Sequence, residues 1–286
     1  MRGSSLRLPF AAAALAAAAS AGLTAAGCAS LRGALGGDGA LAYGLPAVAA
    51  AVYAYGDTTV MDIQMAAVEV RSRGTVELAF EPADGGLRAT VRWVDFEGRL
   101  SSPQGAVDAD ESGIDGPFVL SVDERGRVEL VDVPQLTDAF RQVAGTPGIM
   151  AQALFIRLPG HAVEPGAAWV DTVRVMEEGE GLTSTFQAVV TSTWAGDTIV
   201  EGRTLRVIRR AGALSLGVHG VSQGIEIQQS LTGESAGVAL WDPERRLLVI
   251  REESAELSGT MELPALGAQG VAVQARTRTR LALQGG

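Results

Sequence analysis

The chain has 286 residues and a net charge of −10, with 33 acidic side chains against 23 basic ones. This acidic balance argues against nucleic acid as a partner, because binding to phosphates needs clustered basic groups. Every basic side chain is an arginine, which excludes a phosphate-binding GxxxxGKS/T loop, a Schiff-base lysine and a Ser-Lys dyad, since each needs a lysine amino group.

The amino terminus follows the order of a bacterial export signal. A basic start with Arg2 and Arg7 precedes an apolar run rich in Ala and Leu, which ends in small residues. The last four residues of this stretch, Ala25-Ala26-Gly27-Cys28, resemble the lipobox of bacterial lipoproteins. The resemblance implies that residues 1–27 are a signal peptide and that Cys28, the only cysteine, becomes the lipidated first residue. An uncleaved signal anchor and a secreted protein with an incidental cysteine are the alternatives.

Lipid on Cys28 would hold the mature chain at a membrane surface. Each buried methylene of an acyl chain such as palmitate contributes about 0.8 kcal/mol, so several chains anchor firmly. By the same resemblance, Ala29 in place of Asp favours the outer membrane, with the protein facing the periplasm. Residues 28–44 are rich in Gly, Ala and Leu and are predicted to form a flexible tether. Loss of residues 1–27 would leave a net charge of about −12.

Residues 45–286 are predicted to form a single antiparallel β-rich domain. Most of them alternate apolar and polar side chains with a period of two, as half-buried strands do. Two such runs, 75–80 and 87–94, flank residues 83–86, whose glycines suit the turn of a hairpin. The same alternation predicts further strands at residues 118–122, 127–131, 169–176, 182–193, 199–209, 214–221, 225–231, 238–241, 246–253 and 270–283.

One segment breaks this alternation. Apolar residues between Leu136 and Val143 have helical spacing, which predicts a helix from about residue 135 to 144. Residues 145–148 are expected to interrupt it, and residues 149–156 to resume it. The sequence therefore predicts a mainly β fold with a small α part. Its expected form is a single curved antiparallel sheet or half-barrel around one helical insertion near residues 135–156.

A second resemblance lies directly after the helical segment. Leu158-Pro159, Val163, Pro165-Gly166 and Trp169 look like a stretch of an uncharacterised group of secreted bacterial proteins, in which a Gly turn and a Trp open the strand after a helix. The layout is also similar to the half-barrels of the lipoprotein carriers LolA and LolB, whose concave face holds acyl chains. Neither resemblance supplies a catalytic residue. The predicted one-faced sheet must either fill its concave side with the helix or leave a groove, which could bind an apolar ligand or an envelope partner.

Two GxSxG sequences, at residues 220–224 and 233–237, match the nucleophile motif of α/β-hydrolases. That motif lies between a strand and a helix, and the histidine of its triad follows later in the chain. Here the residues after 224 alternate as a strand, and both histidines precede both serines. We therefore interpret these glycines as bends of a coiled sheet and keep a hydrolase using Ser222 as a less favoured alternative.

Few residues are available to hold a metal. Asp108 and Asp110 match the first positions of a calcium loop, D-x-D-x-S-G, but the twelfth position is Val119, where a bidentate Glu should close the site. Calcium binding is left open, and an acidic solvated loop is the simpler interpretation. His161 and His219 are the only histidines, too few for a zinc site of ordinary composition. We predict no metal and no other cofactor.

Arg276, Arg278 and Arg280 alternate with threonines, so three guanidinium groups project from one strand face. They could meet anionic headgroups or an acidic partner, but solvated pairs with carboxylates such as Glu252 and Glu256 are the simpler interpretation. In sum, the sequence predicts a lipid-anchored, non-enzymatic envelope protein that binds an apolar ligand or an envelope partner. A structural component without a ligand is the main alternative.

Overall fold

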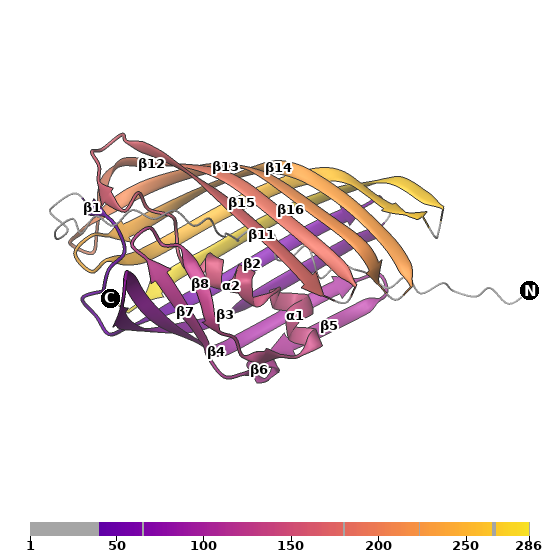
Figure 1. Ribbon diagram of the computed structural model, residues 1–286, viewed down its shortest axis with the longest axis horizontal. Helices are drawn as coiled ribbons and strands as arrows, with labels where there is room; N and C mark the ends of the chain where they lie inside the picture. Colours follow the sequence, from indigo (N-terminus) through magenta and orange to yellow (C-terminus); the bar gives the residue numbers. More distant parts are fainter. Residues whose placement is uncertain (1–39, 65, 180, 223, 265–266, 286) are drawn as a thin grey trace, which may run out of the picture.

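One antiparallel sheet of 12 strands makes up most of the computed structural model (Figure 1), which describes residues 40–64, 66–179, 181–222, 224–264 and 267–285. The predicted signal peptide, Cys28 and tether residues 28–39 lie outside the described residues. In spatial order the strands are β11 (Ala168–Gly179), β12 (Leu182–Val200), β13 (Arg203–Ser222), β14 (Ile225–Asp242), β15 (Leu247–Leu263), β16 (Ala268–Gln284), β2 (Ala50–Ile63), β3 (Ala66–Ala83), β4 (Gly86–Ser102), β7 (Phe118–Asp123) and β8 (Val128–Asp132), with β5 (Gly105–Asp110) also paired to β4.

The sheet is not closed. Its order ends at β11 on one side and at β8 on the other, and in the described part of the chain these two strands do not pair. Every strand pair is antiparallel. The predicted hairpin β3–β4 turns where the sequence indicates, and the predicted strands 118–122 and 127–131 form the hairpin β7–β8. The predicted fold class, a single curved antiparallel sheet with a small helical part, is therefore confirmed.

The strands are longer than the sequence indicates. Predicted strands 214–221 and most of 199–209 are one strand, β13, and 225–231 and 238–241 are both part of β14. The predicted breaks are wrong because glycines there lie inside strands. A Cβ at Gly233 would overlap the carbonyl oxygen of Glu256 on β15, so glycine lets the backbones approach closely where the sheet coils.

Two short helices, α1 (Asp138–Ala144) and α2 (Pro147–Ala153), form the helical insertion. The predicted boundaries need correction at both ends. Residues Gln135–Leu136 form the short strand β9, which pairs with β6 (Ile114–Asp115), and Thr137 caps α1 by accepting a hydrogen bond from Phe140 N. Gly145 and Thr146 separate the two helices within the predicted interruption, but Pro147 already starts α2, because its fixed φ suits the first turn.

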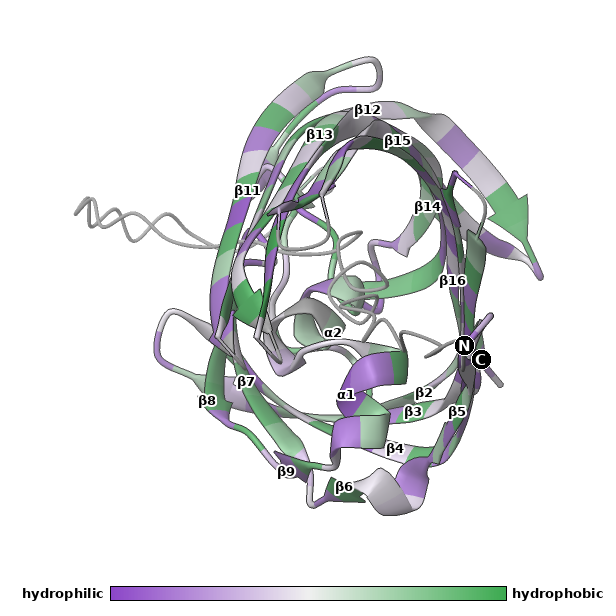
Figure 2. Ribbon diagram, turned by 90° about the vertical axis from the view of Figure 1, so that its right-hand side faces the viewer, coloured by the Kyte–Doolittle hydropathy of each residue, from purple (hydrophilic) through white to green (hydrophobic). Residues whose placement is uncertain are grey.

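The curved sheet surrounds both helices (Figure 2). The ring of Phe140 packs against Phe96 of β4, with centroids 4.7 Å apart. A Cβ at Gly98 would overlap the side chain of Val143, so this glycine lets α1 lie close to the inner face of β4. The buried apolar side chains of the sheet and the helices form one continuous core.

Residues 40–44 belong to the folded domain, so their assignment to the flexible tether is wrong. β1 (Ala40–Leu41) pairs with β10 (His161–Ala162), and Leu41 is fully buried. The Tyr43 hydroxyl accepts a hydrogen bond from Ile156 N at 3.0 Å, and its ring packs edge-on against Trp241. A composition rich in Gly, Ala and Leu does not separate a mobile tether from a segment whose few large side chains enter the core.

Candidate functional site

The GxSxG serines lie in strands. Ser222 ends β13 and the chain turns into β14, so the strand-to-helix turn of a hydrolase elbow is not formed there. Ser235 is buried in the middle of β14, opposite Gly212 and Ala255. His219 is exposed on β13, and the Nδ1 atom of His161 lies 3.0 Å from the carbonyl oxygen of Pro159. The hydrogen bonds of the described residues connect neither histidine to Ser235.

The residues of the calcium-like sequence already have protein partners. Asp108 on β5 accepts a hydrogen bond from Arg99 Nη1 at 2.9 Å. Asp110 caps a short 3-10 helix, Glu111–Gly113, by accepting from Ser112 N at 3.0 Å. Within the described ranges, no group of three or more His, Cys, Asp or Glu side chains is placed to hold a metal ion.

The arginine row on β16 lies on the outer face of the sheet. Arg280 Nε lies 3.0 Å from Glu252 and Arg276 Nε 3.8 Å from Glu256, as the simpler interpretation expects. Arg278 lies between Ser254 and Thr58 of the neighbouring strands.

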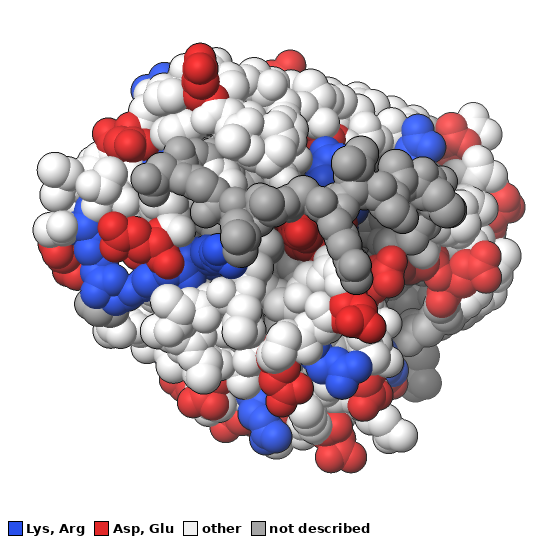
Figure 3. Space-filling view, turned by 60° about the vertical axis from the view of Figure 1, so that its left-hand side comes forward, with Lys and Arg blue, Asp and Glu red and all other residues white. Residues whose placement is uncertain are grey.

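On the face shown in Figure 3, acidic and basic side chains are interspersed.

A row of polar side chains, which we call the inner polar row, crosses the inner face of the sheet. Its members lie directly opposite one another on neighbouring strands, except that Gly237 of β14 lies between Glu253 and Arg210. The members are Ser72, Asp57, Thr279, Glu253, Arg210 and Ser192. Thr279 Oγ1 donates to Asp57 Oδ1 at 2.6 Å. Arg210 and Arg251 both contact Glu253 Oε2 at 2.6 Å. The interior is therefore not uniformly apolar.

Arg251, which contacts Glu253 of the inner polar row, also holds α2 in place. Arg251 Nη1 donates to the carbonyl oxygen of Ala153, the last residue of α2, at 2.7 Å. Arg157, in the segment that follows, donates to the side chain of Gln152 and lies 3.2 Å from the carboxylate of Asp171 on β11. These buried contacts fix the helical insertion between the two ends of the sheet.

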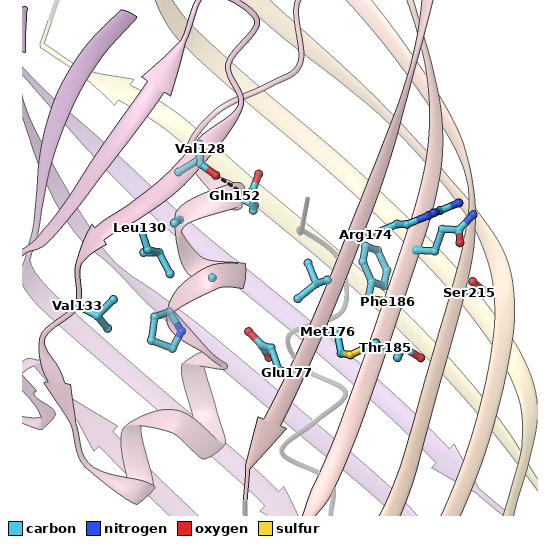
Figure 4. A pocket seen from close by; sticks show the side chains of 15 residues that line it. Val128, Leu130, Val133, Gln152, Arg174, Met176, Glu177, Thr185, Phe186 and Ser215 are labelled. Carbon is cyan, nitrogen blue, oxygen red and sulfur yellow. Dashed lines mark hydrogen bonds between the residues drawn. The ribbon is translucent and has the colours of Figure 1, made fainter. Parts of the chain in front are cut away.

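A cleft of about 990 Å³ opens between those two ends (Figure 4). One wall comes from β8 and α2, and the other from β11, β12 and β13. The lining residues are mostly apolar, with a few polar groups between them: Val128, Leu130, Val133, Pro147, Gly148, Ala151, Gln152, Arg174, Val175, Met176, Glu177, Thr185, Phe186, Gln187 and Ser215. We call this feature the edge cleft.

The edge cleft runs along the border of β11. Successive residues from Arg174 to Glu177 all line it, although neighbouring side chains of a strand point to opposite faces. Met176 is 69% exposed. Glu177 is half-buried and accepts a hydrogen bond from the hydroxyl of Thr146, and burial raises its pKa above the ordinary value. The arrangement offers apolar walls, one partly desolvated carboxylate and a strand edge.

The sequence does not single out these residues. Leu130, Met176 and Glu177 fall within or beside predicted strands, but alternation does not show which strands end the sheet. The predicted stretch from Leu158 to Trp169 does lead into β11, with Gly166 at a positive φ and Trp169 Nε1 donating to Arg157 O at 3.1 Å. It therefore marks where β11 begins, but not that β11 is an edge.

No family model matches the chain, and neither does any curated protein. Among solved structures, the β-domain of the Bordetella autotransporter BrkA aligns over 82% of this chain and 99% of its own, with a TM-score of 0.26 and 12% identity. A DUF1329 family protein from Desulfovibrio piger aligns over 83% and 87%, with a TM-score of 0.15 and 8% identity. Similarities at this level support no functional conclusion. None of the helices in the described residues is long and apolar enough to span a membrane.

Proposed function

We propose that the chain is a lipid-anchored protein of the bacterial envelope, without enzymatic activity, that binds an apolar ligand or an envelope partner in the edge cleft. The anchoring part rests on the lipobox-like sequence that ends at Cys28. Incorporation of a labelled fatty acid into the chain in bacterial cells, lost in the Cys28→Ser variant, is the expected result. A wild-type chain that takes up no label, or that fractionates with the cytosol, would contradict the anchor.

The binding part rests on one observation, the open edge cleft with its apolar walls. Leu130 from one wall, and Val175 and Met176 from the other, line the same cavity, and its volume falls in the range that accommodates small ligands. Leu130 and Met176 remain 37% and 69% exposed. Burial of such side chains by a guest stabilises a complex, at roughly 25 cal/mol per Å² of apolar surface.

The test uses dansylundecanoic acid, a fluorescent probe of apolar surface, with the full chain carrying Cys28→Ser so that the chain has no acyl group of its own. We expect saturable binding, weakened about tenfold or more by Leu130→Asp, because the introduced carboxylate must be desolvated against the guest. Val131→Asp is the matched control. Val131 is the next residue of β8, 54% exposed and outside the lining, so its replacement should leave the affinity unchanged. Equal effects of the two variants, or no binding at all, would contradict the proposal.

A further inference from the structure

The two borders of the sheet are unequal. β8 has only five residues and exposes two carboxylates, those of Glu129 and Asp132. Its Val128 carbonyl oxygen accepts a hydrogen bond from the side chain of Gln152 on α2 at 3.2 Å. Short length, charge and coverage by a helix are the usual protections of an edge strand. β11 has 12 residues and pairs along one side only, with β12. In the described chain, β11 is therefore the longer of the two edge strands, and the backbone N–H and C=O groups along its outer edge have no strand partner.

The edge cleft lies on the side of β11 where, in the described chain, a further strand could pair. It lies along β11, between this strand and β8, and is lined by side chains from both faces of β11. An added strand would place its own side chains alternately on those two faces. An acyl chain could fill the apolar volume but could not pair with the N–H and C=O groups of β11, whereas a polypeptide backbone pairs with them at the strand repeat.

The geometry points to an extended peptide segment of a partner protein as the occupant, adding a strand to β11, with apolar side chains against Leu130 and Val175 and a basic side chain against Glu177. This inference rests on the proposed function and names the partner class of the same site. Glu177 supplies selectivity, because an inward-facing carboxylate disfavours strands that bring only apolar groups or acids to it. Arg174, on the opposite face, favours an acidic residue at a neighbouring position of the guest.

A peptide selection tests this partner class. Random peptides of about eight to ten residues, enough to pair along a strand, would be selected for binding to the full Cys28→Ser chain. We expect selected peptides with alternating apolar residues and an Arg or Lys on the apolar face. They should displace dansylundecanoic acid and slow hydrogen exchange of β11 amides. Glu177→Gln should weaken peptide binding about tenfold by removing one charged hydrogen bond. Glu178→Gln, the exposed neighbouring position, is the matched control and should have no effect.

The outcomes separate this inference from the proposed function. If the dansyl probe binds the cleft but no peptide displaces it, or if peptides bind without slowing β11 exchange, the strand inference is wrong and the apolar cleft remains. A dimer of the chain with protected β11 amides before any peptide is added would make a second copy the occupant and overturn the inference. If neither probe nor peptide binds, both proposals fail.

Discussion

Replacement of Glu253 by Gln is expected to lower the free energy of unfolding by about 3–5 kcal/mol, because it removes the carboxylate that lies between two buried guanidinium groups. Arg210 and Arg251 both lie 2.6 Å from Glu253 Oε2, and all three side chains are less than 10% exposed. Burial alone would raise the pKa of Glu253, but the two guanidinium groups outweigh burial and hold that pKa below its ordinary value. Denaturation in urea, followed by circular dichroism, measures the loss.

Glu252→Gln is the matched control for that experiment. Glu252 is the preceding residue of β15, 61% exposed on the outer face, and its partner Arg280 is 62% exposed. An exposed pair of this kind is worth less than about 1 kcal/mol, so this variant should unfold almost as the wild type does. Similarly small effects of the two replacements would show that burial of Arg210 and Arg251 does not depend on Glu253.

Asp57→Asn should stabilise the chain at neutral pH by on the order of 2–3 kcal/mol and have little effect near pH 4. Burial raises the pKa of Asp57 from 3.8 to about 6, although Thr279 and Thr59 stabilise its charged form. The folded chain therefore binds the proton more tightly than the unfolded chain. The stability that this proton contributes is fully present below the unfolded pKa and is lost as the pH rises through about 6.

Urea denaturation of the wild type and the Asp57→Asn variant at about pH 4.5 and pH 7.5 checks this prediction. The difference between the two proteins should grow with pH. Asp62→Asn, at an exposed position further along β2, is the control and should change the free energy of unfolding little at either pH. A difference for Asp57→Asn that stays constant, or that favours the wild type at high pH, would show that the carboxylate of Asp57 is well stabilised inside the sheet.

Local patterns in the sequence predict the elements of this fold well. Period-two alternation identifies the strands, and the apolar spacing around Phe140 identifies the helical insertion, because side-chain periodicity follows from backbone geometry. The strand lengths are less predictable. Gly233 interrupts the alternation in the sequence but continues β14 in space, since only the neighbouring strand shows why a side chain is excluded there.

The candidate site depends on relations that no local pattern contains. Val128, Leu130 and Val133 face residues 174–177 across the edge cleft only because the sheet curves until its two ends face each other across α2. The inner polar row likewise joins residues from Asp57 to Thr279 through strand register. By contrast, the serines of the two GxSxG motifs lie in strands, and the D-x-D-x-S-G sequence passes from β5 into a capped turn, where local hydrogen bonding accounts for its polar side chains.

The proposed site requires that the side of β11 facing the cleft has no strand partner, as in the described part of the chain. Hydrogen exchange of the free chain at neutral pH, resolved by residue, tests this directly, with the central strand β13 as the internal reference. In the free protein, every second amide from Arg174 to Glu177 should exchange far faster than the amides of β13, because these residues line the cleft and, in the described part of the chain, β11 has no strand partner on that side. Exchange of all β11 amides as slow as that of β13 would show that this border is already covered, and would contradict the proposed site.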